Sequence, residues 1–130
     1  MTTIENLTLL DTLIKCRVLI TPPEKFTKNA YAKNATGFPT SAHNADATCF
    51  CLLGSAMHIT GYDHEGYHIK GSQYEMYTEV VVQLQRQLRL MTDISDEYMG
   101  VAQHSDSSTH EQAMTLLDNT IARVKAEAKQ

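Results

Sequence analysis

The feature that most constrains this chain is a short apolar run, Asp46-Ala-Thr-Cys-Phe-Cys-Leu-Leu-Gly-Ser-Ala-Met-His58. Small residues are interspersed among its large apolar ones, and Gly61 follows close behind. Such a run is typical of a helix that is buried on every side and against which the rest of a small domain packs. We therefore expect a helix over residues 45–60, with Asn44 or Asp46 as its N-cap and Gly61 at its end.

Three further segments carry the spacing of amphipathic helices. The first covers residues 3–20 and must stop before Pro22-Pro23, because proline cannot continue a helix. The second covers residues 73–91, and the last begins at Thr109. Apolar residues three and four apart predict one buried stripe per helix: Ile4, Leu7, Leu10, Ile14 and Val18 in the first; Tyr77, Val80, Val81, Leu84, Leu88 and Met91 in the second; Met114, Leu117, Ile121 and Val124 in the last.

The start of the last helix carries a capping signal. Ser108 and Glu111 have the spacing of a capping box, in which a hydroxyl and a carboxylate satisfy free backbone N–H groups. A short helical turn is expected before it, within residues 94–102.

The remaining segments lack helical periodicity. Residues 21–44 contain a turn at Asn34-Ala-Thr-Gly37 and predict a short β-hairpin or an ordered loop. Residues 61–72 hold three glycines and predict a polar loop. The expected fold is one mainly α domain over residues 1–130, with about four helices around the central apolar helix and one hairpin or loop insertion.

Composition excludes several classes of function. Eleven Lys and Arg against fifteen Asp and Glu give a net charge of -4, so a general nucleic-acid binder is not expected. The longest apolar run is well below the roughly 20 residues that span a bilayer, and no membrane association is expected. Three cysteines make an odd count without framework spacing, and the N-terminus lacks the features of a signal peptide. We expect a cytoplasmic protein.

Three segments in this order resemble a family of small uncharacterised proteins from bacteria and their phages, known as a domain of unknown function. Residues 23–37 are similar to the family's Pro-Glu-aromatic-x-x-Gly-Ala-x-Ala-x-Asp-x-x-Gly segment. Cys51-Leu-Leu-Gly-Ser-Ala56 resembles its Cys-x-x-Gly-Ala-Leu helix. Residues 105–118 resemble its Asn-Asp-x-x-x-Thr-x-x-x-Val-x-x-x-Leu start of a final helix. The resemblance implies a fold and leaves the function open.

The chain departs from the family pattern at three places. Phe26 stands where Trp is usual, Asn29 where Gly is usual, and His104-Ser105 where an aromatic-Asn pair is usual.

The sharpest local cluster of reactive side chains lies in the polar loop. Asp63, His64 and His68 offer a carboxylate and two imidazoles, which are ligands for Zn²⁺ or another divalent ion, and Glu65 offers a general base. The alternative is a solvated loop whose histidines titrate near neutrality.

The cysteines predict little chemistry. On a helix, Cys49 and Cys51 would point about 200° apart, so neither could bridge the other. We expect thiols that pack as small apolar groups, because a nucleophilic thiolate needs a basic partner.

The predicted ligand-binding residues lie in two segments. Across the expected hairpin, Lys28, Tyr31, Lys33 and Asn34 interleave cations, an aromatic ring and an amide, which suits an anion. Before the last helix, His104 and Asp106 complete the set. The alternatives are a solvated hairpin face and, for Asp106, a role in capping the helix.

Three functions follow from these observations. The preferred one is a non-enzymatic binding protein of a phage or bacterial cytoplasm, which sequesters a small anionic ligand or inhibits a host factor. The second is a small metal-dependent hydrolase at Asp63, His64 and His68. The third is a structural homo-oligomer in which an exposed stripe of the 73–91 helix pairs with a second copy.

Overall fold

The computed structural model describes residues 4–62, 71–91 and 109–128. These ranges hold the four helices α1 (Ile4–Leu19), α2 (Leu52–Thr60), α3 (Gly71–Met91) and α5 (His110–Ala128). They also hold a 3-10 turn, η1 (Pro23–Lys25), and the strands β1 (Ala32–Asn34), β2 (Pro39–Thr40) and β3 (Ala47–Phe50). The predicted mainly α fold with a small β insertion is confirmed. The turn predicted within residues 94–102 lies outside the described residues.

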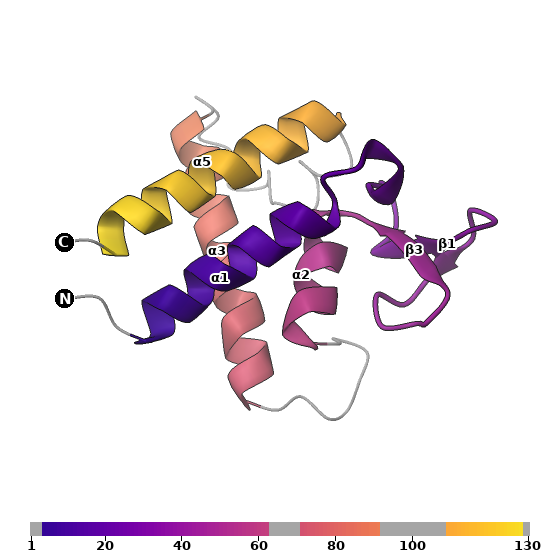
Figure 1. Cartoon of the computed structure of the whole chain (residues 1–130), viewed down its shortest axis with the longest axis horizontal. Coiled ribbons are helices and arrows are strands. Elements are labelled where there is room, and N and C mark those ends of the chain that lie inside the picture. The colour runs from indigo at the N-terminus through magenta and orange to yellow at the C-terminus, as the bar shows by residue number, and fades with distance from the viewer. Residues whose placement is uncertain (1–3, 63–70, 92–108, 129–130) are drawn as a thin grey trace.

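The helices form one body and the strands stand at one end of it (Figure 1). α1 and α5 run side by side in opposite directions, and α3 crosses behind α1. Among the described elements, α1 packs against α2, α3 and α5, whereas α2 packs against α1, α3 and β3. The Arg17 Nε atom donates to Asp118 Oδ1 at 2.8 Å and links α1 to α5 at the surface. Each described helix is too short or too polar to cross a membrane.

The buried face of α1 differs from the predicted stripe. Leu9, Leu13 and Cys16 are buried, while Ile14 is exposed and Val18 is 64% exposed. The prediction of Ile14 and Val18 as core residues is wrong. Apolar residues occur around the whole helix, so their spacing suits either face, and contacts with α2, α3 and α5 select the buried one.

The stripes of α3 and α5 largely agree with prediction. Val80, Leu84 and Leu88 are buried in α3, and Met114, Leu117 and Val124 are buried in α5. Met91, at the end of α3, is exposed instead of buried.

The capping box of α5 lies one residue later than expected. The Thr109 hydroxyl accepts from the Gln112 N–H at 3.1 Å, and the Gln112 side-chain oxygen accepts from the Thr109 N–H at 2.9 Å. This reciprocal pair satisfies the free N–H groups at the helix start. Thr109 and Gln112 therefore serve where the sequence predicted Ser108 and Glu111.

The 21–44 segment forms the predicted hairpin, and a third strand completes a sheet of order β2-β1-β3. β1 pairs antiparallel with β2 through Ala32 and Thr40, and with β3 through Ala32 and Phe50. The buried Ala32–Phe50 pair belongs to the hydrophobic core. The register shifts after Lys33, which leaves Thr48 as the extra residue of a β-bulge.

The prediction of a helix over residues 45–60 is wrong for the first part of this range. β3 occupies residues 47–50, and α2 begins at Leu52 with Cys51 as its N-cap. Asn44 is not a helix cap: its side-chain oxygen accepts from the Asp46 N–H at 2.9 Å in a turn. A short apolar run does not distinguish a buried strand from a buried helix, and pairing with β1 decided the outcome. The end at Gly61 is confirmed, since Gly61 has a φ of 81° and donates its N–H to the Met57 carbonyl.

Candidate functional site

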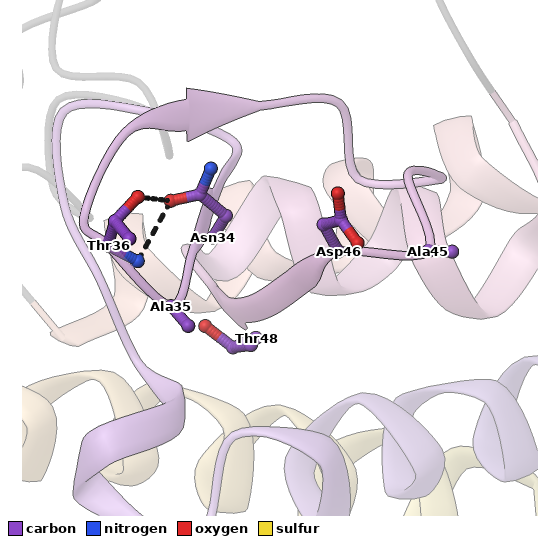
Figure 2. Close-up of a pocket in the computed structure, with 6 residues that line it drawn as sticks. All are labelled: Asn34, Ala35, Thr36, Ala45, Asp46 and Thr48. Carbon is purple, nitrogen blue, oxygen red and sulfur yellow. Dashed lines mark hydrogen bonds between the residues drawn. The ribbon is translucent and has the colours of Figure 1, made fainter.

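The turn of the hairpin is held by one side chain. The Asn34 Oδ1 atom accepts hydrogen bonds from the Thr36 N–H at 3.0 Å, from the Thr36 hydroxyl at 2.7 Å and from the Phe38 N–H at 3.0 Å. Gly37 has a φ of 88°, which glycine adopts without steric cost. Figure 2 shows the amide nitrogen of Asn34 pointing away from the turn. The fold thus uses the oxygen of this predicted ligand residue and leaves its nitrogen directed outward.

An open hollow of about 420 Å³ lies beside this turn. Its walls come from the hairpin and from the start of β3 (Figure 2) and consist of Asn34, Ala35, Thr36, Ala45, Asp46 and Thr48. The one charged side chain in this lining is the Asp46 carboxylate. The charge of this lining is therefore negative, and it does not favour the small anion that the sequence predicted.

The lining of this hollow does not include the exposed aromatic side chains of the hairpin. Phe38 is 67% exposed and Tyr31 is 38% exposed. Lys33 is half-buried in β1, between Cys49 on β3 and Pro39 on β2. We call Tyr31, Lys33 and Phe38 the hairpin surface. All three belong to the strands and loops at the end of the helical body (Figure 1).

Four of the six predicted ligand residues lie in the described part of the chain. Lys28, Tyr31, Lys33 and Asn34 fall within seven residues, and Lys28 is half-buried. His104 and Asp106 lie outside the described residues, so their position relative to the hairpin stays a prediction.

The predicted metal ligands, Asp63, His64 and His68, and the predicted base Glu65 also lie outside the described residues. Within the described ranges, no group of three or more His, Cys, Asp or Glu side chains could hold a metal ion. Elemental analysis of the untagged protein, before and after replacing both His64 and His68 by alanine, tests the prediction of a metal centre.

A junction that the sequence analysis missed joins the hairpin to α2. The Cys51 N–H donates to the Tyr31 carbonyl at 3.2 Å, and the Cys51 sulfur accepts from the Gly54 N–H at 3.3 Å. A Cβ atom on Gly54 would lie 1.7 Å from the Tyr31 carbonyl oxygen, so only glycine fits there. The signal was present in the sequence as Cys-x-x-Gly at the start of the helix. This junction holds Tyr31 in place at the start of β1.

A cluster of tyrosine rings joins the end of α2 to α3. The Tyr62 ring stacks on Tyr77 with centroids 4.4 Å apart and contacts Tyr74 at 5.6 Å. Burial raises the pKa of Tyr77 well above its usual value, and the neighbouring Tyr31, Tyr62 and Cys51 add to the shift. The stacked rings therefore hold Tyr62, which follows α2, against α3.

Three histidines link distant segments through main-chain carbonyls. His43 Nε2 donates to the Tyr62 carbonyl at 2.6 Å, His58 Nδ1 to the Ala42 carbonyl at 2.9 Å, and His110 Nε2 to the Ile20 carbonyl at 2.8 Å. A carbonyl oxygen only accepts, so each of these ring nitrogens carries a proton. The Phe26 ring packs edge-on against His110 at 5.8 Å. These contacts give the three side chains a structural role.

The three cysteines lie in or next to elements of secondary structure. Cys16 is buried in α1, and this burial raises the pKa of its thiol to about 12. Cys51 caps α2, and Cys49 is half-buried in β3. The three cysteines are free thiols.

The model of a family described as "Family of unknown function (DUF6197)" matches residues 5–123. No curated protein and no solved structure matches the chain.

Proposed function

We propose that this chain, which belongs to the Family of unknown function (DUF6197), is a non-enzymatic binding protein. Its hairpin surface docks an acidic segment of a partner protein. The observation that carries the proposal is the exposure of two aromatic side chains, Phe38 at 67% and Tyr31 at 38%, on the hairpin that also holds Lys33. Large exposed aromatic side chains favour contact with a partner, which removes them from water.

Charge supports an acidic partner. Residues 21–44 contain three lysines and one glutamate, whereas the whole chain has a net charge of -4. Within the described part of the chain, Lys28 and Lys33 form no ion pair. An excess of cations in this segment of an otherwise acidic protein attracts an acidic partner segment towards the hairpin.

The junction at Cys51 and Gly54 supports the surface mechanically. It holds the Tyr31 main chain against the first turn of α2, and the Asn34 side chain holds the turn that carries Phe38. A surface fixed before binding loses less conformational entropy when it meets its partner. In the form suggested by the family resemblance, the partner is a host protein and the chain is a phage product that inhibits it in the bacterial cytoplasm.

The experiment compares two variants with matched changes. Immobilised wild-type protein is incubated with bacterial lysate beside Lys33→Glu/Phe38→Ser and a control, Lys15→Glu/Val18→Ser. The control removes one lysine and one apolar side chain of similar exposure from α1, where Val18 is 64% exposed. We expect a partner that the wild type and the control retain, that Lys33→Glu/Phe38→Ser loses, and that added salt elutes. Equal retention by all three proteins, or by none, would contradict the proposal.

A small anionic ligand is the second candidate, and the half-buried Lys28 and Lys33 favour it. Nucleotides and inorganic phosphate are then expected to raise the melting temperature of the wild type. The Lys33→Glu/Phe38→Ser variant should lose this rise, and no rise with the wild type would exclude these anions.

A further inference from the structure

The outer face of α3 carries an ordered set of side chains that the hairpin proposal does not use. Glu75, Glu79, Val82, Arg86 and Arg89 follow one another at spacings of four, three, four and three residues, and all are exposed. At about 100° per residue, this spacing keeps them on one face of a helix. The buried Val80, Leu84 and Leu88 lie on the opposite face. The set is therefore a continuous stripe along the exposed side of α3.

Charge is distributed along this stripe in two blocks. The acidic residues Glu75 and Glu79 occupy its N-terminal half, the basic residues Arg86 and Arg89 occupy its C-terminal half, and Val82 lies midway. Within the described ranges, these four charged side chains form no ion pair.

The helix dipole does not account for the whole pattern. It favours acids in the first turn and bases in the last turn of a helix, and its effect falls off beyond them. α3 runs from Gly71 to Met91, so at 3.6 residues per turn Glu79 lies about two turns after its start and Arg86 about one and a half turns before its end, and both lie outside the terminal turns. The helix dipole therefore leaves the positions of Glu79 and Arg86 unexplained. Contact with a charged partner on this face of α3 would explain them.

We infer that this face of α3 binds the same face of a second copy of the chain, antiparallel and with a two-fold axis at Val82. Residues that lie equally far from Val82 on opposite sides then meet across the axis. Glu75 faces Arg89 of the second copy, Glu79 lies beside its Arg86, and the two Val82 side chains meet at the centre. Every charged residue thereby finds an opposite charge, and the interface is self-complementary, as two-fold symmetry requires.

The pattern selects the antiparallel arrangement. In a parallel pair, Glu75 and Glu79 would face their own copies, and so would Arg86 and Arg89. Like charges placed directly opposite one another oppose association. The antiparallel pair avoids this at each position.

The size of the stripe predicts a weak dimer. From residue 75 to residue 89 the helix rises about 21 Å, at 1.5 Å per residue. The apolar part comprises Val82 and, on the flank, Leu90, which is 71% exposed. An interface this small belongs to the class that forms transiently. We expect dissociation in the micromolar range or weaker, with strong dependence on salt, because exposed ion pairs are screened.

Charge exchange between two variants gives the decisive experiment. Glu75→Arg/Glu79→Arg makes the stripe wholly basic, and Arg86→Glu/Arg89→Glu makes it wholly acidic. Sedimentation equilibrium at low salt, up to about 1 mM protein, measures the association of each variant alone and of their equimolar mixture. All substituted side chains are exposed, and circular dichroism confirms that both variants fold.

The wild type is expected to dimerise with concentration, and each variant alone is expected to lose about tenfold or more in affinity. The mixture is expected to form a heterodimer at least as tight as the wild-type dimer. The control Glu24→Arg/Glu111→Arg changes net charge as Glu75→Arg/Glu79→Arg does, at exposed positions elsewhere, and should dimerise like the wild type.

Three results would overturn the inference: a monomeric wild type at the highest concentration, variants that associate as the wild type does, or a mixture that stays monomeric. The hairpin variant Lys33→Glu/Phe38→Ser should keep the dimer, so failure of this inference and failure of the proposed function are separate outcomes.

Discussion

Replacing Gly54 by alanine tests the junction between α2 and the hairpin. Gly54 lies inside α2, where helix propensity alone predicts that alanine stabilises the protein by about 0.5–1 kcal/mol. The structure predicts the opposite. The new Cβ atom would lie 1.7 Å from the Tyr31 carbonyl oxygen and 2.7 Å from its carbon.

The magnitude follows from these two distances. Carbon and carbonyl oxygen atoms that touch lie about 3.3–3.6 Å apart, so the helix and the hairpin must separate by more than an ångström. Such overpacking costs about 1–3 kcal/mol. The same movement stretches the Cys51 N–H bond to Tyr31, whose loss costs about 1 kcal/mol. After subtraction of the propensity gain, the free energy of unfolding of the Gly54→Ala variant should be about 1–3.5 kcal/mol lower than that of the wild type.

Thermal and urea denaturation measure this change. For a chain of this length, 1 kcal/mol corresponds to a shift in Tm of about 3–4 °C, so a fall of about 3–14 °C is expected. Gly37→Ala is the control, because its φ is 88° and a Cβ there would have no atom within 4 Å. That variant reports the cost of backbone strain alone, about 1 kcal/mol. A Gly54→Ala protein that melts at or above the wild-type temperature would refute the close approach.

Three further predictions concern single side chains. Asn29 has a φ of 65°, so Asn29→Ala should lower the free energy of unfolding by about 1 kcal/mol more than Asn29→Gly does, as urea denaturation would show. The pKa of Cys16 rises from its ordinary value of 9.0 to about 12 on folding, so the unfolded chain loses this proton first and stability falls as pH rises from 9 towards 12. Relative to pH 7, the loss at pH 10 should be about 1.4 kcal/mol, and a Cys16→Ala protein with the same pH dependence as the wild type would contradict it. Iodoacetamide should modify the half-buried Cys49 of the native protein before the buried Cys16, which mass spectrometry of timed samples can check.

The ends of elements were predictable where the chemistry is local. Pro22 and Pro23 stop α1, and Gly61 ends α2 because it adopts a left-handed conformation at little cost. The hairpin turn was likewise readable, since Asn34 and Gly37 supply the hydrogen bonds and the positive φ that it needs. Asn29 also has a left-handed backbone conformation, which favours glycine. This conformation gives a physical reason for the glycine that is usual at this position in the family pattern.

Predictions failed where two conformations satisfied the same local pattern. Residues 47–50 suited a helix as well as a strand, and pairing of Phe50 with Ala32 selected the strand. The apolar residues of α1 suited two faces, and packing against α2, α3 and α5 buried Leu13 while leaving Val18 exposed. The position of the α5 capping box was uncertain by one residue, because Ser108 and Thr109 are both good caps.

The two candidate surfaces, which are the hairpin surface and the exposed face of α3, also combine features that the sequence predicts with features that only the fold decides. The residue types of the hairpin surface and the charge order along α3 could be read directly from the amino-acid sequence, because they depend on spacing alone. The exposure of Phe38, the contact of Gly54 with Tyr31 and the solvent-facing position of the α3 charges depend on which segments meet. These contacts join residues that are far apart in the chain, so no local periodicity encodes them. The free energy of packing the whole core decides which segments come into contact.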